Sequence, residues 1–493
     1  MFGLFSKKVA RPSAPLLLTN TLSRKKEHFS PQKKGAVSLY SCGPTVYSRA
    51  HIGNLRAYVF SDVLARTLAV AGYHVRRVIN ITDVGHLVSD GDEGEDKMEV
   101  GARREGLSAE DIASRYTGMF LKDIEELNVD NESIVFPRAT AYIKEQIAMI
   151  EVLEKKGHTY RITDGMYFDT STFMGYGKLG GVPEEYIHDG SAQTLPERAE
   201  LSMKGRIAEN SQKRHPADFA LWKFSPKGEK RLQEWESPWG RGFPGWHIEC
   251  SAMAKALLGV EIDIHTGGID HIPIHHNNEI AQSESANGRP FVRYWMHSAF
   301  LSLGEKISKS LGNVVYLSDI TDKGLDPLSL RYLFLQAHYR SPLAFSWDAL
   351  AAADEALGRL RRACALIQKE SKGVSVSSDT RNKLIAILQD DLQTPQALAL
   401  LWETVRSDEL SAKVQWGVIE AAEKVLALSL TDSPALLSMN EVPPDVQELL
   451  REREDARKAR DFAKADQIRI HIETRGYLVE DTASGPLLSK KRK

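Results

Sequence analysis

The sequence predicts an α/β protein in which a parallel sheet is interrupted by an insertion and followed by an all-α C-terminal region. Three observations support this fold class. Residues 36–83 have the pattern of a strand, a helix and a second strand. A Gly-rich, charged stretch separates them from sheet-like sequence that resumes near residue 216, and amphipathic helical patterns follow beyond about residue 345.

The first strand is AVSLYS, residues 36–41, and a glycine-proline turn follows it. A helix begins near Asn54, because apolar residues recur at every fourth position from Leu55, and Gly72 ends it. The next segment, residues 74–83, is rich in β-branched side chains and is typical of a second strand. Such a βαβ unit requires a parallel sheet, and it places the start of its helix at the carboxyl edge of the strands, where Rossmann-like folds bind nucleotides.

Changes in composition divide the chain into seven expected parts. The middle of the chain combines a helical run with a Gly-rich, charged stretch, which is typical of an insertion into the first fold. The parts are an N-terminal extension (1–20), the first half of the sheet domain (21–134), the insertion (135–215), the second half of the sheet domain (216–300), a connecting segment (301–345), a helical region (346–440) and a C-terminal segment with a basic tail (441–493).

Size and composition are those of an ordinary soluble protein with several domains, since 493 residues exceed the size of one core and 42% are hydrophobic. The formal net charge of −2 gives no general attraction to nucleic acid, so any such contact needs a local basic patch. Three cysteines are too few for a disulfide framework and fit a reducing cytoplasm. The sequence has no apolar stretch of about 18 residues, so a membrane span is not expected. Residues 1–20 lack a signal-peptide pattern and are expected to be loosely ordered, with a transit peptide as the alternative.

The segment HIGN, residues 51–54, lies in the loop that opens the first helix. Backbone N–H groups and the helix dipole favour phosphate at this position, and Gly53 allows a close backbone approach. The side chains of His51 and Asn54 can donate hydrogen bonds to such a ligand. A loop histidine beside a glycine turn is the alternative that four residues alone leave open.

The segment KISKS, residues 306–310, provides two cations, Lys306 and Lys309, within the Gly-flanked sequence GEKISKSLGN. Lysines on a mobile loop can follow the charge that develops on a phosphoryl group in a transition state. Taken alone, this segment is more typical of a solvated surface loop. Together, HIGN and KISKS resemble the signature pair of class I aminoacyl-tRNA synthetases, and the resemblance implies that both segments bind ATP.

Four further residues indicate a metal site, namely Cys42 at the end of the first strand, Cys250 in GWHIEC, and His275 with Glu279 in HHNNEIAQSE. His275 and Glu279 are four positions apart, so on a helix both can reach one ion. Two thiolates, an imidazole and a carboxylate are a ligand set suited to zinc. Buried thiols and a helix-capping histidine are the alternative, because the ligands are widely spaced in the sequence.

Several motifs, in their order and spacing, are similar to those of the cysteinyl-tRNA synthetase family. They are SCGPTVY followed by HIGN, then DFALWK, PGWHIECSAM, HHNNEIAQSE, YWMHS, KISKSLGN, RSPLAFS, the TPQAL helix and ARKARDFAKADQIR. The resemblance extends from about Leu22 to about Glu480 and therefore includes the helical C-terminal region.

This resemblance implies a zinc ion in the amino-acid pocket, held by Cys42, Cys250, His275 and Glu279, with the sulfur of the substrate cysteine bound to it. A coordinated thiol loses its proton, whereas the hydroxyl of serine is a much poorer ligand. A separate editing domain would then be unnecessary. The helical region and residues 441–493 are expected to bind tRNA, the latter on the anticodon side, in a cytoplasmic monomer.

In the same family, ATP with Mg²⁺ activates cysteine, and the resulting cysteinyl-adenylate reacts with the terminal hydroxyl of tRNA. The resemblance places ATP against Gly43, Thr45 and the two signature segments, with Lys309 as the first choice for direct contact. It places Trp246 beside the substrate, with His247 next to it. Without the resemblance, both aromatic residues would more often belong to the core.

The chain departs from the family pattern at Asn54, where many members have a histidine, so a hydrogen-bond donor is kept but any positive charge is lost. Ile307 replaces the commoner methionine, a volume-conserving change that we expect to be tolerated. The acidic residues 90–96 are expected to form a solvated loop, with Mg²⁺ binding as the alternative. His271 and His276 crowd the zinc-ligand segment, and either could support a ligand from behind.

Three other functions stay open at this point. A cysteine ligase with an amino-sugar acceptor would share the zinc and ATP site but would not need the helical C-terminal region. A catalytically silent RNA-binding paralogue would not need intact ligand and signature residues, and the zinc could be purely structural. Residues 451–493 contain 12 Lys or Arg against 8 Asp or Glu, which suits contact with tRNA phosphates.

Overall fold

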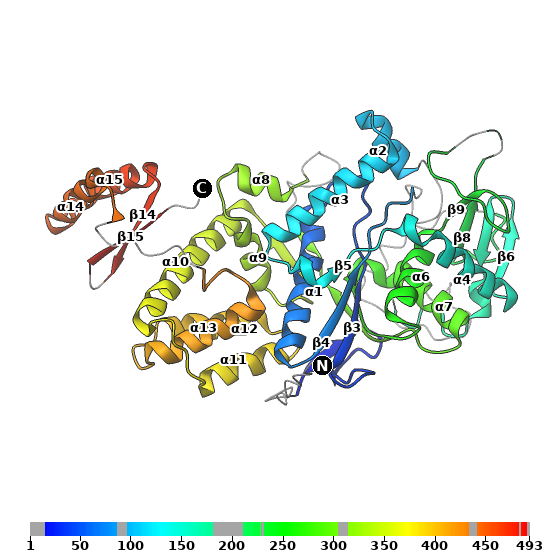
Figure 1. Cartoon of the computed structure of the whole chain (residues 1–493), viewed down its shortest axis with the longest axis horizontal. Coiled ribbons are helices and arrows are strands. Elements are labelled where there is room, and N and C mark those ends of the chain that lie inside the picture. The colour runs from blue at the N-terminus through cyan, green and yellow to red at the C-terminus, as the bar shows by residue number, and fades with distance from the viewer. Residues whose placement is uncertain are drawn as a thin grey trace, which may run out of the picture. The chain divides into compact units, whose positions relative to one another are not determined.

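The chain divides into two compact units in the computed structural model. The first unit contains the predicted parallel sheet and the second is mostly helical, so the predicted fold class is confirmed (Figure 1). The first unit is formed by residues 1–354 and 385–398, and the second by residues 355–384 and 399–493. The structure describes residues 15–85, 96–180, 211–226, 228, 231–303, 314–432, 441–482 and 485–490.

The core of the first unit is a sheet of five parallel strands, which in spatial order are β11 (Val292–Ser298), β10 (Ile262–Gly268), β3 (Ala36–Ser41), β4 (His74–Ile79) and β5 (Ile134–Val135). The chain runs from β3 to β4 on one side of the sheet and from β10 to β11 on the other. The strand order therefore reverses between β3 and β10. Open parallel sheets bind their ligands at the carboxyl ends of the strands at this kind of switch point.

Helices cover both faces of this sheet. The predicted first helix is α1 (Ile52–Val70), and its apolar stripe packs against one face, where it meets Leu39 of β3. Successive strand side chains point to opposite faces, so the adjacent Tyr40 belongs to the core on the other face. The helices that contribute to this second core are α4 (Ile143–Lys155), α6 (Trp246–Leu258) and α7 (Asn277–Asn287).

An antiparallel sheet of four strands begins in the insertion, in the order β6 (Thr159–Ile162), β7 (Gly165–Phe168), β8 (Phe219–Phe224) and β9 (Gly242–Pro244). Because β8 pairs with β7, this sheet extends beyond residue 215. The sequence instead predicts that the second half of the parallel-sheet domain begins at residue 216. The reason is that β8 is almost entirely buried, and a short apolar run reads the same in a buried antiparallel strand as in a parallel one.

The N-terminal segment differs from the loosely ordered extension that the sequence predicts, since residues 17–20 form β1. Leu18 is fully buried, and the Asp391 carboxylate accepts hydrogen bonds from the backbone and hydroxyl of Thr19 and from the hydroxyl of Tyr339. Asp391, near the C-terminal end of the first unit, therefore binds both the N-terminal strand and the segment around Tyr339. The other elements of this unit are β1 (Leu17–Asn20), β2 (Lys25–His28), α2 (Lys97–Glu105), α3 (Ala109–Glu126), β12 (Leu301–Leu303), α8 (Leu317–Asp322), α9 (Pro327–Leu335) and β13 (Leu343–Phe345).

The remaining helices are α10 (Trp347–Ser371), α11 (Asp379–Gln389), α12 (Thr394–Val405), α13 (Ala412–Leu426), α14 (Pro444–Lys458) and α15 (Phe462–Thr474). Besides these helices, the C-terminal region contains an antiparallel hairpin, β14 (Tyr477–Thr482) and β15 (Gly485–Lys490), which an all-α region does not include. The hairpin and the last two helices share a small apolar core that contains Val446, Ile472 and Leu488. No helix in the described part of the chain is long and apolar enough to cross a lipid bilayer.

Candidate active site

The HIGN segment forms the start of α1, at the carboxyl edge of the parallel sheet. The Nδ1 atom of His51 accepts a hydrogen bond from the backbone N–H of Asn54 at 3.3 Å, and the Asn54 Oδ1 atom accepts one from the backbone N–H of His51 at 3.1 Å. This reciprocal capping box satisfies two N–H groups at the helix start. A Cβ atom on Gly53 would lie 3.0 Å from the His51 ring, so a larger residue here would require this ring to shift.

A cavity of about 540 Å³ opens beside this helix start. His247 is only 2% exposed and lies behind the wall of the cavity, where its Nδ1 atom is 2.9 Å from Nδ1 of His275. Most of the sequence-predicted residues instead line the cavity directly. Those that line it are Cys42, Gly43, Thr45, His51, Gly53, Asn54 and Trp246.

The four sequence-predicted metal ligands come from different elements and meet at Cys42, which is the one of the four that lines this cavity. We call Cys42, Cys250, His275 and Glu279 the first donor set, and their ligand atoms all lie within 4.8 Å of one another. Cys42 directly follows β3, Cys250 is on α6 and Glu279 is on α7. His275 lies in a single π-helical turn, residues 272–276, that precedes α7.

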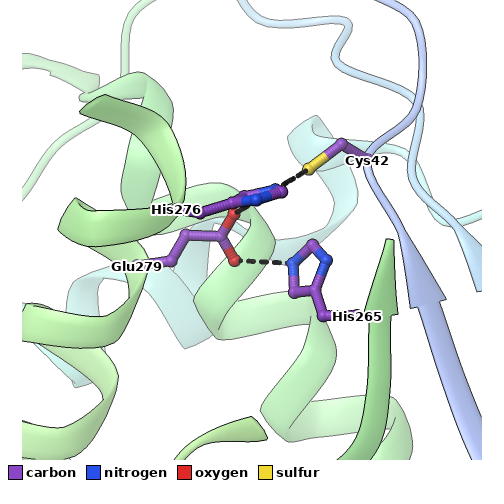
Figure 2. Close-up of side chains that lie close together, drawn as sticks. All are labelled: Cys42, His265, His276 and Glu279. Carbon is purple, nitrogen blue, oxygen red and sulfur yellow. Dashed lines mark hydrogen bonds and ion pairs between the residues drawn. The ribbon is translucent and has the colours of Figure 1, made fainter. Parts of the chain in front are cut away.

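A second group of four overlaps with the first, and Figure 2 shows its side chains. This second donor set consists of Cys42, His265, His276 and Glu279, whose ligand atoms also lie within 4.8 Å of one another. The Cys42 sulfur is 3.3 Å from Nε2 of His276, and the Glu279 Oε2 atom is 3.0 Å from Nε2 of His265 (Figure 2). Because the two sets share Cys42 and Glu279, an ion held by one set takes two ligands that the other set needs.

The side chains of the first donor set influence one another's protonation. Burial alone would raise the pKa of the Glu279 carboxyl group, but His265 and His275 lower it to about 2. The hydrogen bond with Cys42 lowers the pKa of the Cys250 thiol to about 7, whereas burial raises the pKa of Cys42 well above its usual value. The cluster therefore stabilises a carboxylate and a thiolate near neutral pH, and these anionic groups are what a divalent cation requires as ligands.

The orientation of His275 also suits a metal. Its Nε2 atom is buried and lies 2.9 Å from Oε1 of Glu279, so a nitrogen and an oxygen of the first donor set face each other. Its Nδ1 atom faces His247, so a neighbour holds the imidazole from behind, as is usual for metal-ligating histidines. Two sulfurs, one nitrogen and one oxygen at this separation are a donor set that fits zinc.

Of the two histidines that the sequence leaves open, only His276 belongs to a donor set among the described residues. Its Nδ1 atom is 2.7 Å from Nε2 of His297, which holds the ring in place. His271 instead lines the cavity, where its ring lies edge-on to Trp246. Trp246 also packs against His275, with ring centroids 4.5 Å apart, and so borders both the cavity and the first donor set.

Two parts of the predicted site lie outside the described residues. They are the KISKS segment with Lys306 and Lys309, and all but the last residue of the acidic stretch 90–96. The residues on either side of KISKS are described, and Phe300, Val314 and Tyr316 line the cavity.

Reasoning from the sequence missed several residues of the site. His265 lies on β10, next to β3 in the sheet, and Asp270 follows the carboxyl end of β10 and lines the cavity. A signal for Asp270 was present, because polar residues just after the carboxyl end of a parallel strand face the ligand edge of such a sheet, whereas His265 lies in the middle of β10. Arg49 also lines the cavity, two positions before the HIGN segment.

Comparisons with known proteins cover nearly the whole chain. The profile of the family described as tRNA synthetases class I (C) catalytic domain matches residues 28–355, and the profile described as cysteinyl-tRNA ligase anticodon binding domain matches residues 439–485. Cysteine–tRNA ligase 1 of Burkholderia lata is 48% identical over 477 residues, which are 96% of this chain and 97% of the relative. Cysteine–tRNA ligase of Treponema denticola is 41% identical over 497 residues, covering 95% of this chain and 98% of the relative.

Solved structures of other synthetases have a similar fold. The Mycobacterium tuberculosis methionyl-tRNA synthetase in complex with methionyl-adenylate matches with a TM-score of 0.54 at 15% identity, covering 80% of this chain and 92% of that chain. The LeuRS–tRNA–LeuAMS complex of Agrobacterium radiobacter K84 matches with a TM-score of 0.59 at 11% identity, covering 82% of this chain and 85% of that chain. At these identities the match concerns the fold alone.

Proposed function

Because this chain belongs to the cysteinyl-tRNA synthetase family of class I aminoacyl-tRNA synthetases, we propose that its cavity binds ATP and cysteine and that the first donor set selects the cysteine. The chain is an enzyme that joins cysteine to tRNA at the expense of ATP. One observation carries the assignment of the site. Cys42 belongs to a cluster of four metal-ligating side chains and lines the same cavity as the HIGN segment.

On the amino-acid side, Cys42, Cys250, His275 and Glu279 would hold one zinc ion, and Trp246 would border the bound substrate. When bound, zinc supplies a Lewis acid that favours the thiolate of cysteine over the hydroxyl of serine. A pocket that relied on shape alone would separate such close analogues by only about 10- to 200-fold. We favour the first donor set over the second because its two thiolates suit zinc better than one thiolate with two imidazoles.

On the nucleotide side, the start of α1 presents backbone N–H groups and the positive end of the helix dipole to the phosphates of ATP. His51 and Asn54 border this position, Gly53 allows close approach, and Gly43 and Thr45 form the facing turn. We propose that Lys306 and Lys309 neutralise the charge that develops on the phosphates. Mg²⁺ would accompany ATP as its counter-ion.

The reaction then has two steps. The carboxylate of cysteine attacks the α-phosphorus of ATP, the bond to the β-phosphate breaks, and pyrophosphate leaves with the electron pair. The terminal ribose hydroxyl of tRNA next attacks the carbonyl carbon of the cysteinyl-adenylate, and AMP leaves. No side chain of the enzyme acts as a covalent nucleophile, so positioning and electrostatic stabilisation provide the acceleration.

Two other features of the assignment are proposals of the same kind. The match of residues 439–485 to an anticodon-binding domain favours tRNA over an amino-sugar acceptor and over a silent paralogue with no catalytic role. A monomer would be complete, because the cavity and both donor sets come from one chain. The three cysteines are free thiols, which fits a role in the reducing cytoplasm.

Replacing Cys42 by serine tests the role of zinc. We expect the Cys42→Ser enzyme to bind less zinc and to lose most of its preference for cysteine over serine, with the remaining preference at or below about 10- to 200-fold. The measurement is ATP–pyrophosphate exchange with each amino acid, together with the zinc content. A Cys364→Ala enzyme is the control, since this buried thiol belongs to α10. Unchanged discrimination in Cys42→Ser would mean that the metal is structural.

Replacing Lys309 by alanine tests the nucleotide side. Loss of one charge-stabilising donor typically lowers the rate of such chemistry by about 100- to 1000-fold, and we expect this fall in cysteine-dependent ATP–pyrophosphate exchange with no change in zinc content. The exposed Lys144 of α4 provides the control Lys144→Ala, which should behave as the wild type. Normal exchange by Lys309→Ala would remove this residue from the activation step.

A further inference from the structure

Arg56 lies on α1, two positions after the HIGN segment, and is only 3% exposed. Within the described part of the chain, no carboxylate pairs with its guanidinium group. Burial lowers its pKa to about 10, but the group remains charged at neutral pH. A buried charge is costly unless its hydrogen-bonding capacity is used, so the partners of this group show what it is for.

The partners of Arg56 are backbone carbonyl groups from two separate segments. Its Nη1 atom donates to the carbonyls of Ala299 at 2.9 Å and Phe300 at 2.7 Å. Its Nη2 atom donates to the carbonyls of Ser341 at 2.6 Å and His338 at 3.4 Å. Each arm of the planar fork therefore holds one segment, and the fixed angle between the arms sets the spacing of both segments from α1.

The first of these segments forms a wall of the cavity. Ala299 and Phe300 join β11 to β12, and both residues line the cavity that also contains His51 and Asn54. Phe300 is 46% exposed, so its side chain is not fixed by burial in a core. Its backbone is instead fixed by hydrogen bonds, of which the one from Arg56 joins it to the helix that begins with HIGN.

The second segment supports the first. Residues 338–341 lead into β13, which pairs in parallel with β12, and the backbone N–H of Ala299 donates to the Tyr339 carbonyl at 2.8 Å. Arg56 thus binds the segment just before β12 and the segment just before β13. In the sequence, β12 runs directly into GEKISKS, which lies outside the described residues.

The start of α1 also holds the chain on the other side of KISKS. The backbone N–H of Ile52 donates to the Val315 carbonyl at 3.0 Å, and Nη1 of Arg49 donates to the Ser318 hydroxyl at 2.6 Å. The described chain is therefore held on both sides of KISKS by residues in or near HIGN. Arg56 holds the chain before KISKS, and Arg49 and Ile52 hold the chain after it.

We infer that Arg56 is a positioning residue for ATP chemistry, which holds the Ala299–Phe300 wall of the cavity, and the strand that leads to KISKS, at a fixed distance from the HIGN helix start. This inference rests on the proposed function, because it takes this cavity as the ATP site. It assigns no contact between Arg56 and ATP. The effect is exerted through the backbone, and it requires the two arms of an arginine.

Two variants of the full-length enzyme separate positioning from simple stability. Arg56→Lys keeps the charge but, as a single ammonium group, cannot hold both segments at the spacing set by the fork. Arg56→Met keeps much of the side-chain volume and leaves all four carbonyls without this donor. Arg66→Met is the matched control, because Arg66 is also on α1 but its partners, the Asp62 carboxylate and the Asn128 carbonyl, do not line the cavity.

The measurements are thermal unfolding, zinc content, and cysteine-dependent ATP–pyrophosphate exchange with ATP and cysteine varied separately. Small misplacements near reacting groups can lower rates by about 100-fold, so we expect kcat/KM for ATP to fall by about 10- to 100-fold in both Arg56 variants, less in Arg56→Lys. The KM for cysteine and the zinc content should stay within about twofold of wild type. Arg66→Met should lower the Tm but leave kcat/KM for ATP unchanged.

Several results would overturn the inference. These are a wild-type kcat/KM for ATP in folded Arg56→Lys, an equal fall in Arg66→Met, or a parallel rise in the KM for cysteine. If Arg56→Met does not fold, Arg56→Lys still decides the question. Absence of cysteine-dependent exchange in the wild-type enzyme would instead contradict the proposed function, and it is therefore distinguishable from a failure of this inference.

Discussion

Asp62 on α1 is fully buried, and three guanidinium groups surround its carboxylate. The Oδ2 atom is 2.7 Å from both Arg66 and Arg331, and Oδ1 is 3.3 Å from Arg77. These arginines belong to α1, α9 and β4, so one carboxylate joins the first helix, a strand of the sheet and the second helix after the KISKS segment. Burial alone would raise the pKa of Asp62, but Arg331, Arg66 and Arg77 lower it to about 2.

Replacing Asp62 by asparagine should destabilise the first unit by about 3 to 5 kcal/mol, because removal of one partner leaves buried guanidinium groups without a counter-charge. Urea unfolding at pH 7 measures this loss. Asp390→Asn provides the control, since the same substitution there breaks a half-exposed pair with Lys26 and should cost less than about 1 kcal/mol. Equal effects of the two substitutions would show that the buried cluster has no special role.

The same carboxylate predicts a pH dependence. Its pKa in the folded state, about 2, is lower than the usual value of 3.8, so its contribution to stability is complete above about pH 5 and is lost as the pH falls through the folded pKa. The shift corresponds to about 2 kcal/mol. The free energy of unfolding of the wild type should therefore fall more steeply between pH 5 and about pH 2 than that of Asp62→Asn. Parallel curves would contradict this prediction.

At the scale of single residues, the sequence predicted the amino acids of the site better than their partners. Cys42, Cys250, His275 and Glu279 could be chosen because their chemistry and order match a family, and the structure brings their ligand atoms together. Arg56 could not be chosen, because its partners are backbone carbonyls far away in the sequence. Such partners leave no pattern of side chains to read.

At the scale of elements, the carboxyl ends of β3 and β4 come unusually close together. A Cβ atom on Gly43 would lie 1.5 Å from the backbone oxygen of Asn80, and the N–H of Gly43 donates to the Asn80 Oδ1 atom at 2.8 Å. Only a residue without a side chain fits there. This close approach holds Cys42, the preceding residue, at the edge of the cavity.

Replacing Gly43 by alanine should therefore lower the free energy of unfolding by about 3 kcal/mol or more, at or above the upper end of typical overpacking costs, and reduce zinc content. Equilibrium unfolding in urea and metal analysis are the measurements. Gly118→Ala is the control, because Gly118 is exposed within α3 and has no other atom near an added Cβ. That substitution should stabilise the helix by about 0.5 to 1 kcal/mol. A Gly43→Ala enzyme of wild-type stability would show that the strands can separate at little cost.

Periodicity predicted the elements of this chain but not all of their neighbours. The apolar repeat predicted α1 with a start near Asn54. The helix begins two residues earlier, at Ile52, because His51 caps it. The sheet to which β8 belongs could not be predicted, because a buried apolar run does not reveal its partner strand. Likewise, an ideal helix from His275 to Glu279 is replaced in part by a π turn, in which Pro273 provides no backbone N–H.

At the scale of the whole molecule, the residues that line the cavity and form both donor sets all lie between residues 42 and 316. Residues 442–488 have an apolar core of their own. A chain that ends at residue 432 should thus retain cysteine-dependent ATP–pyrophosphate exchange within about threefold, but charge tRNA with a kcat/KM about 100-fold lower, equivalent to about 3 kcal/mol of lost binding. Measuring both reactions with one preparation tests this, and full tRNA charging by the shortened chain would contradict it.

The order of the large parts along the chain was visible in the sequence, because composition changes where sheet gives way to helices. The division between the two units was not, since residues 385–398 belong to the first unit although helical sequence surrounds them. Amphipathic patterns report that a helix has a buried face, but they do not report which core buries it.

Each passage of the chain between the two units falls within a helix, namely α10, α11 and α12. Genetic recombination exchanges contiguous stretches of sequence, so a crossover at any of these three boundaries would cut a helix. One at residue 354 would also carry away Asp391, the residue that anchors Thr19 and Tyr339. Recombination can therefore exchange residues 441–490, which have an apolar core of their own, without cutting these helices, whereas an exchange within α10, α11 or α12 would disturb the unit that contains the parallel sheet.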